Sequence, residues 1–189
     1  MDSIDFSIFS FFVNLYKLDK LGVNTSKKIT EYGRLIRGHL KKFGKFENAT
    51  WKNIVYVQNL RDHLYNFSSE CLLARVAKTY GYSVELDIKP DVKIENIDFE
   101  IKRNNSNNLS NAIDKARSQV HDVIAIEVEN LNKKEIPHYS LPSYEATWLK
   151  KGNLRDVLKT ILCIKFDGEI ILLFTQTIKG LKARIILIK

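Results

Sequence analysis

The arrangement of apolar residues between positions 97 and 128 constrains the fold more than any other feature of the chain. Apolar and polar residues alternate from Ile97 to Arg103, which is the period of a half-buried strand. Val123–Val128 is an almost continuous apolar run, as expected for a buried strand. With a helix predicted from about Leu109 to His121, the order strand, helix, strand implies a parallel pair with a right-handed crossover. We therefore expect an α/β fold with a mixed central sheet flanked by helices.

A hairpin and a helix are predicted ahead of this unit. The extended segments expected here are 82–88, 91–94 and 97–103, with Glu95-Asn96 as the turn of the hairpin. Before them, an amphipathic stripe with Ser68 or Ser69 as N-cap predicts a helix that Gly81 ends.

The two ends of the chain have different patterns. Residues 1–66 have helical periodicity, and the helices are expected over about 6–18, from Thr25 or Ser26 to about Lys42, and from about Thr50. The second of these helices would bury Ile29, Tyr32, Ile36 and Leu40. After a loop over 129–148, we expect a short helix over 154–159, a hairpin with arms 161–166 and 169–174, and a last strand over 183–189. The predicted division is a helical N-terminal region, 1–65, and an α/β domain, 66–189.

One face of the strand that begins at Ile97 is acidic and basic at once. It carries Asp98, Glu100 and Lys102, because side chains alternate along a strand. A two-residue turn at Glu95-Asn96 would place Asp91 opposite Glu100, with Cβ atoms roughly 5 Å apart. Carboxylates that close repel each other unless a cation lies between them. Mg²⁺ or Mn²⁺ suits such oxygen ligands, and Lys102 can orient water or neutralise charge on a phosphate.

A simpler interpretation of the same residues stays open. They also fit an ordinary charged hairpin, in which Lys93–Asp98 and Glu100–Lys102 are surface ion pairs worth about 0–1 kcal/mol each. Asp98 in particular pairs with Lys93 more readily than it binds a metal, so it is a secondary candidate.

Pro90-Asp91, eight intervening residues and Glu100-Ile101-Lys102 resemble the motif of the PD-(D/E)XK nuclease superfamily. The resemblance implies a restriction-endonuclease-like core, with Asp91 and Glu100 as metal ligands and Lys102 as the catalytic lysine. In that family an acid on the preceding helix assists, and its counterpart here is Glu70, in the first turn of the predicted helix. Gln119 resembles a polar position that some members use near the site, although a solvent-facing glutamine fits equally well.

A second resemblance narrows the family. Glu70-Cys71-Leu72-Leu73 followed by Gly81-Tyr82-Ser83-Val84 is similar to the opening of archaeal Holliday-junction resolvases and related archaeal viral nucleases. The likeness covers about residues 66–128, a third of the chain. It implies an endonuclease that hydrolyses DNA, branched DNA included, with Mg²⁺ or Mn²⁺ as cofactor. Joint cleavage of two strands would favour a homodimer. An RNA-directed nuclease of the tRNA-cleaving toxin type, or a non-catalytic nucleic-acid-binding protein, are the alternatives.

The charge of the chain is compatible with a nucleic-acid partner. The 30 Lys and Arg exceed the 22 Asp and Glu, which gives a net charge of +8. Between Lys17 and Phe46, nine basic and two acidic residues leave +7. Such a helix face can displace counterions from a phosphate backbone, although a solvated helix face explains it as well. The residues expected to contact nucleic acid are Lys27, Lys28, Arg34, Arg37, Lys41, Lys42 and Arg103.

Cysteine usage and the first apolar run bear on location. Cys71 and Cys163 are far apart and each sits in an apolar run, so both are expected to be buried free thiols, as in a reducing cytosol. The run Ile8–Leu15 is too short to span a bilayer and lacks the basic start of a signal peptide. We expect a cytoplasmic protein with no membrane partner.

Overall fold

The computed structural model describes residues 4–43, 51–104, 109–119, 121–131 and 146–189. The helices are α1 (Ile4–Asp19), α2 (Ser26–Phe43), α3 (Trp51–Thr79), α4 (Leu109–Arg117) and α6 (Leu154–Cys163). The strands are β1 (Val84–Leu86), β2 (Val92–Ile94), β3 (Ile97–Asn104), β4 (Val123–Val128), β5 (Ala146–Asn153), β6 (Glu169–Thr177) and β7 (Gly180–Ile188). None of the described helices is both long enough and apolar enough to cross a membrane.

The described strands form one mixed sheet in the order β1-β2-β3-β4-β6-β7-β5. The pairs β3–β4 and β4–β6 are parallel, and the remaining pairs are antiparallel. The expected α/β class, with a mixed sheet flanked by helices, is confirmed. So is the turn at Glu95-Asn96, since Ile94 pairs with Ile97 and Lys93 with Asp98.

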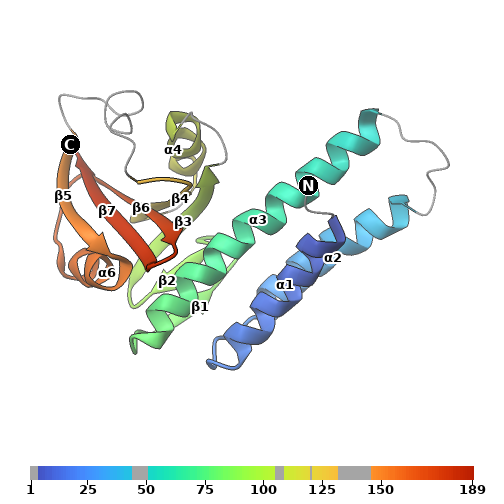
Figure 1. Ribbon diagram of the computed structural model, residues 1–189, viewed down its shortest axis with the longest axis horizontal. Helices are drawn as coiled ribbons and strands as arrows, with labels where there is room; N and C mark the ends of the chain where they lie inside the picture. Colours follow the sequence, from blue (N-terminus) through green and yellow to red (C-terminus); the bar gives the residue numbers. More distant parts are fainter. Residues whose placement is uncertain (1–3, 44–50, 105–108, 120, 132–145) are drawn as a thin grey trace.

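The two faces of the sheet bury different helices. Phe99 and Ile101 of β3 belong to a core shared with α1, α2, α3 and α6. Ile124 and Ile126 of β4 face the opposite way, into a smaller core with α4. In Figure 1, α3 lies between the sheet and the pair α1 and α2, so the N-terminal helices form an outer layer.

An aromatic cluster ties the three N-terminal helices together. The ring of Phe67 on α3 lies 4.8 Å from the rings of both Phe11 on α1 and Tyr32 on α2, measured between centroids. The rings of Phe11 and Tyr32 are 5.2 Å apart. All three side chains are buried, so α1 and α2 are held to α3 by a packed apolar core.

The helix that leads into the sheet is longer than the sequence pattern suggests. α3 runs for 29 residues without a break, so the prediction of a separate helix capped by Ser68 or Ser69 was wrong. Ser69 is buried within α3, and its hydroxyl donates to a carboxylate oxygen of Glu127 on β4. Its polar group therefore has a tertiary partner and does not end the helix. The position 65/66, where we expected the two regions to meet, lies inside α3, and Glu70 lies well past its first turn.

The C-terminal third also differs from the prediction. α6 continues to Cys163, because Leu154, Val157, Leu158 and Ile161 form one buried helical stripe, and Asn153 caps it by accepting from the Asp156 amide. The segment 161–166 is therefore not a strand. The hairpin here joins β6 to β7, with Thr177 paired to Gly180, and the last strand begins before Ala183.

The segment 129–148, predicted to be a loop, is described only in part. Residues 132–145 lie outside the described residues, and β5 begins at Ala146. β5 pairs with β7 at the edge of the sheet. Its residues are mostly exposed, which is why no regular apolar alternation marks it in the sequence.

Candidate active site

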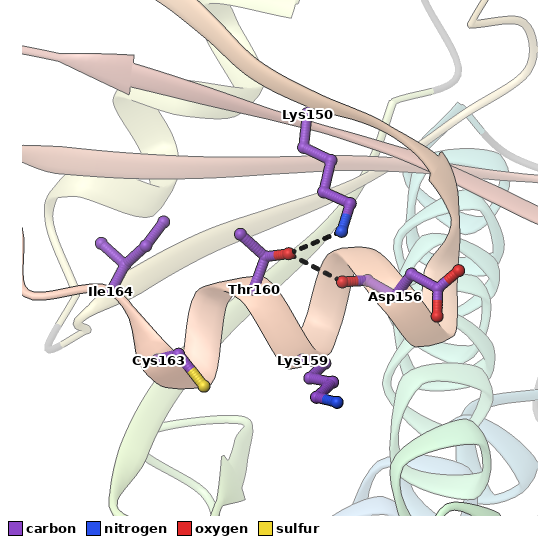
Figure 2. Close-up of a pocket in the computed structure, with 6 residues that line it drawn as sticks. All are labelled: Lys150, Asp156, Lys159, Thr160, Cys163 and Ile164. Carbon is purple, nitrogen blue, oxygen red and sulfur yellow. Dashed lines mark hydrogen bonds between the residues drawn. The ribbon is translucent and has the colours of Figure 1, made fainter.

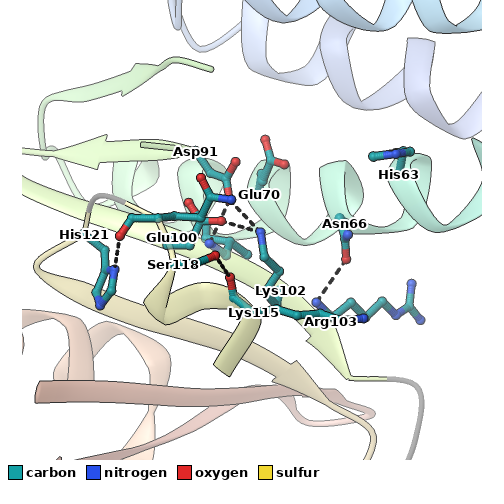
Figure 3. A network of polar contacts seen from close by, with 12 residues as sticks. His63, Asn66, Glu70, Asp91, Glu100, Lys102, Arg103, Lys115, Ser118 and His121 are labelled. Atoms are coloured by element: carbon teal, nitrogen blue, oxygen red, sulfur yellow. Dashed lines mark hydrogen bonds and ion pairs between the residues drawn. The ribbon is translucent and has the colours of Figure 1, made fainter. Parts of the chain in front are cut away.

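The four residues predicted to be catalytic lie together in space. Glu70 comes from α3, Asp91 directly precedes β2, and Glu100 and Lys102 are on β3 (Figure 3). Glu70 and Glu100 are each only 3% exposed. Both ion pairs of the simpler interpretation, Lys93–Asp98 and Glu100–Lys102, are present, but Glu100 is buried and its pair is therefore not a surface contact. Burying two carboxylates is costly unless other groups compensate their charge.

Asp91 occupies the middle of this cluster. Its Oδ2 accepts a hydrogen bond from the backbone amide of Ile101 at 2.9 Å, which fixes the carboxylate against β3. Its Oδ1 lies 3.7 Å from Nζ of Lys28, and its Oδ2 lies 3.8 Å from Nζ of Lys102. Two ammonium groups therefore approach the same carboxylate, one at each oxygen.

Lys102 connects Asp91 to Glu100. Its Nζ donates to Oε1 of Glu100, two residues away on the same face of β3. The lysine side chain is 22% exposed, and Asp91 is 13% exposed, so this end of the cluster is open to solvent. Glu100 itself is 3% exposed, so solvent reaches the cluster at Lys102 and Asp91.

Lys28 reaches the cluster from α2. It was expected to contact phosphate from an exposed helix face, but it is 2% exposed, and its Nζ lies 2.8 Å from Oε2 of Glu70. Lys28, rather than Ile29, lies on the buried stripe of α2. The prediction that Ile29 is buried was wrong, since Ile29 is 48% exposed. Lys28 stands four residues before Tyr32 and eight before Ile36, so the helical period does mark it as inward-facing.

Burial and mutual repulsion control the charge of the acids. Burial, then the nearby charge of Asp91, raises the pKa of Glu70 to about 8, although Lys28 opposes this shift. The same two causes raise the pKa of Glu100 above its usual range, against the effect of Lys102. Burial alone would lower the pKa of Lys28, but Glu70 and Asp91 more than offset it and the pKa is raised. Lys28 is therefore an ammonium group. The cluster contains three carboxyl groups, and the ammonium groups of Lys28 and Lys102 do not compensate all of their negative charge.

The donor set suits a hard divalent cation. Mg²⁺ commonly takes one or two carboxylates and completes its shell with water and substrate phosphate. Asp91 and Glu100 supply that pair, and the shared contact with Lys102 marks them as neighbours. Among the described residues, no three His, Cys, Asp or Glu side chains are arranged around one metal position. Glu70 faces Lys28 instead, and no well-directed hydrogen bond reaches its Oε2 in this part of the chain.

The secondary candidates are placed as follows. Asp98 pairs with Lys93, Oδ1 to Nζ at 3.3 Å, at the far end of the hairpin from Asp91. Gln119 is half-buried after α4, and its backbone carbonyl oxygen lies 2.8 Å from Nδ1 of His121. His121 is near enough to Glu100 to lower the pKa of that carboxyl slightly. The ion pair of Asp98 is the one that the hairpin register predicts.

A basic and aromatic group formed by α3 and the end of β3 adjoins the site and was not predicted as a whole. The guanidinium carbons of Arg103 and Arg61 lie 5.0 Å and 5.4 Å from the centre of the Tyr65 ring. The Arg103 amide donates to Oδ1 of Asn66 at 3.1 Å, which anchors the end of β3 to α3 (Figure 3). Arg103 was expected to contact nucleic acid. Arg61 and Tyr65 were missed because α3 was divided at this point.

The predicted basic residues of α2 separate into three groups. Arg34, Arg37 and Lys41 are exposed and lie on one side of the helix, as their spacing of three and four requires. Lys27 is exposed but pairs with Asp87 and Glu85 of the first strand region. The side chain of Lys42 lies outside the described residues.

A pocket elsewhere has no comparable chemistry. It has a volume of about 470 Å³ and lies along α6 (Figure 2). Its lining residues are Lys150, Asp156, Lys159, Thr160, Cys163 and Ile164. Lys150 and Thr160 bond to each other at 3.1 Å, and no buried acid faces the space. Cys163 is exposed here, so its predicted burial was wrong, whereas Cys71 is buried as expected.

No protein-family model matches the chain, and comparisons with curated proteins and with solved structures give no match. The functional argument therefore depends on the residues and distances of the site.

Proposed function

We propose that the chain is a Mg²⁺- or Mn²⁺-dependent endonuclease of the PD-(D/E)XK type that hydrolyses DNA. The observation that carries the proposal is the convergence of Asp91, Glu100 and Lys102 around shared contacts, with two of the three carboxylates of the cluster almost fully buried. A protein that only binds nucleic acid gains nothing from buried carboxylates next to phosphate, since like charges repel.

The chain's own residues divide the work of hydrolysis. Asp91 and Glu100 hold the cation, and the Ile101 amide keeps Asp91 in place. The bound cation supplies Lewis acidity, which lowers the pKa of a water molecule and stabilises charge on the phosphate. Lys102, which contacts both Asp91 and Glu100, would place its ammonium group beside the oxygen that gains negative charge.

Binding of the DNA backbone falls to basic groups beside the site, where Arg103 and Arg61 are half-buried, and along α2. Arg103 and Arg61, held over Tyr65, present guanidinium groups next to Lys102. Arg34, Arg37 and Lys41 continue the positive charge along α2. We propose that a homodimer acting in the cytoplasm would bring two such sites to a duplex or a junction.

Cleavage of a labelled panel tests the proposal. Linear duplex, four-way junction, single strand and tRNA are incubated with Mg²⁺, Mn²⁺ or EDTA, using wild type, Glu100→Gln and the control Asp98→Asn. Because loss of a metal ligand removes several kcal/mol of transition-state stabilisation, Glu100→Gln should lower the rate at least about a thousandfold. Asp98→Asn should leave cleavage within about tenfold of wild type, since Asp98 pairs with Lys93.

The pattern of cleavage decides between functions. Metal-dependent cutting of duplex or junction supports the proposal. Preferred cutting of tRNA would show an RNA-directed nuclease with the same site. Binding without cutting under every condition would show a non-catalytic nucleic-acid-binding protein and overturn the proposal.

A further inference from the structure

Lys28 is the one lysine among the described residues whose side chain is almost completely buried, and all its charged partners are carboxylates. Its Nζ lies 2.8 Å from Glu70, 3.7 Å from Asp91 and 3.9 Å from Glu31. An ammonium group in this position costs desolvation that only well-placed negative charge can offset. The α2 helix therefore delivers a fixed positive charge into the acidic cluster.

Asp91 divides the cluster into two compartments. Its Oδ2 faces Lys102 and, through that lysine, Glu100. Its Oδ1 faces Lys28 and, through that lysine, Glu70. In two-metal nucleases a carboxylate commonly bridges two cations about 3.5–4 Å apart. Asp91 has this bridging position, but on the Glu70 side the charge is an ammonium group of the chain itself.

We infer that Lys28 takes the place of a second cation, so that the site binds one divalent ion, on Asp91 and Glu100, and Glu70 is the partner of Lys28 rather than a metal ligand. This inference rests on the proposed nuclease function, but the number of bound ions can be measured whether or not the protein cuts nucleic acid. It agrees with the finding that no three acidic side chains of the described residues surround one metal position.

The arrangement assigns Lys28 a positioning role. It stays buried and does not touch substrate, because its side chain points inward from α2 and is 2% exposed. Its charge holds Oδ1 of Asp91 on the α2 side, so Oδ2, on the side of Lys102 and Glu100, would be the oxygen available to a cation. A permanent ammonium group also needs no second ion from solution, so one equivalent of metal completes the site.

Counting Mn²⁺ ions on the full chain tests the inference. Free Mn²⁺ is followed by its electron paramagnetic resonance signal during titration of wild type, Lys28→Met and the matched control Lys27→Met. Wild type and Lys27→Met should each bind one Mn²⁺. Lys28→Met should bind two Mn²⁺ ions, because loss of the ammonium group leaves Glu70 and Asp91 facing each other across a space that an ion can enter. Two ions on wild type, no ion on wild type, or one ion on folded Lys28→Met would each overturn the inference.

A second variant covers the case in which Lys28→Met does not fold by circular dichroism. Glu70→Gln should weaken Mn²⁺ binding by no more than about tenfold, which is the smallest loss of affinity usual for a residue that contacts a metal ligand but not the metal. Glu100→Gln should abolish Mn²⁺ binding. Equal loss in both variants would make Glu70 a ligand and refute the inference.

Cleavage recorded on the same samples separates this inference from the proposed function. If wild type binds one Mn²⁺ but cuts no nucleic acid, the role of Lys28 is supported and the proposed nuclease function is refuted. If wild type cuts DNA with two bound ions, the nuclease function is supported and the role of Lys28 is refuted.

Discussion

At the residue scale, the contact between Lys28 and Glu70 decides how the acidic cluster is tolerated. The two charged atoms are 2.8 Å apart, and both side chains are nearly inaccessible to solvent. Removing one partner of such a pair is far more damaging than replacing both, because the remaining charge is left buried and unpaired.

Lys28→Met should therefore destabilise the protein in a pH-dependent way. At pH 9, where Glu70 is ionised, the loss should be about 3–5 kcal/mol, and at pH 6 it should be much smaller because Glu70 then carries a proton. Urea unfolding of wild type and variant at both pH values measures it. The double variant Lys28→Met with Glu70→Gln should lose this pH dependence, and an equal loss at both pH values would contradict the assignment.

The raised pKa of Glu70 makes a second prediction about wild type. Because folding raises this pKa from its ordinary value of 4.5 to about 8, the folded state holds the proton more tightly. The resulting stability is fully present below about pH 4.5 and is lost as the pH rises through 8. In EDTA, the melting temperature should fall between pH 6 and pH 9, and Glu70→Gln should reduce this fall.

Mn²⁺ should have the opposite pH dependence. The cation requires ionised carboxylates, and the pKa of Glu100 is also raised, so the stabilisation by Mn²⁺ should be larger at pH 8 than at pH 6. Thermal unfolding with and without the ion measures it. A stabilisation that is independent of pH would argue against these acids as its source.

The spacing of Asp91, Glu100 and Lys102 along a hairpin was sufficient to predict that they meet, because cross-strand register is local. The partnership of Lys28 with Glu70 was not predicted, since it depends on how α2 packs against α3. The helical period alone placed Lys28 inward, but a lysine within a basic helix is normally solvated, and the prediction followed that rule.

At the element scale, α3 is the helix on which both the N-terminal layer and the sheet are built. It carries Phe67 into the aromatic cluster and Glu70 into the acidic cluster within one turn. Its continuity was hidden in the sequence because Ser68 and Ser69 resemble a helix start. Their hydroxyl groups instead have tertiary partners: Ser68 accepts from the Asn14 side chain, and Ser69 donates to Glu127. The hairpin at the C-terminus was misplaced for a related reason, since an apolar run such as 161–164 fits a helix or a strand equally well.

Phe67→Ala should show that the N-terminal helices and the sheet unfold together. Deleting this ring leaves a cavity among Phe11, Tyr32 and α3, at a cost of about 3–5 kcal/mol. The same change at Phe9, which is 66% exposed on α1, should cost less than about 0.5 kcal/mol. Circular dichroism reports the helices, and Trp148 fluorescence, in a Trp51→Phe background, reports the sheet. Two separate transitions would mean that the layers fold independently.

At the scale of the whole molecule, positive charge is distributed unevenly around the site. The exposed stripe of Arg34, Arg37 and Lys41 belongs to α2 in the outer helical layer, whereas α6 lies at the opposite end of the molecule (Figure 1). If the stripe contacts DNA, each residue should release about one counterion on binding.

Replacing the three stripe residues with glutamine should therefore weaken DNA binding and reduce its dependence on salt. The slope of log affinity against log salt should fall in magnitude by about 2.7, or about 0.9 for each contact. The control changes Lys151, Lys159 and Lys165 to glutamine, which removes the same charge near α6. Fluorescence anisotropy with labelled duplex and inactive Glu100→Gln protein measures both, and equal effects would show that only net charge matters.

Lys28 and Lys41 stand on one uninterrupted helix, and this fixes a length as well as a charge. Thirteen residues separate them along α2, or about 20 Å at 1.5 Å per residue. A duplex advances about 3.4 Å per base pair, so this span equals about six base pairs. If the protein is a nuclease as proposed, a DNA arm shorter than about six base pairs on the α2 side of the cut would occupy the site without reaching Lys41. The protein should therefore bind DNA with short arms less tightly than DNA with long arms.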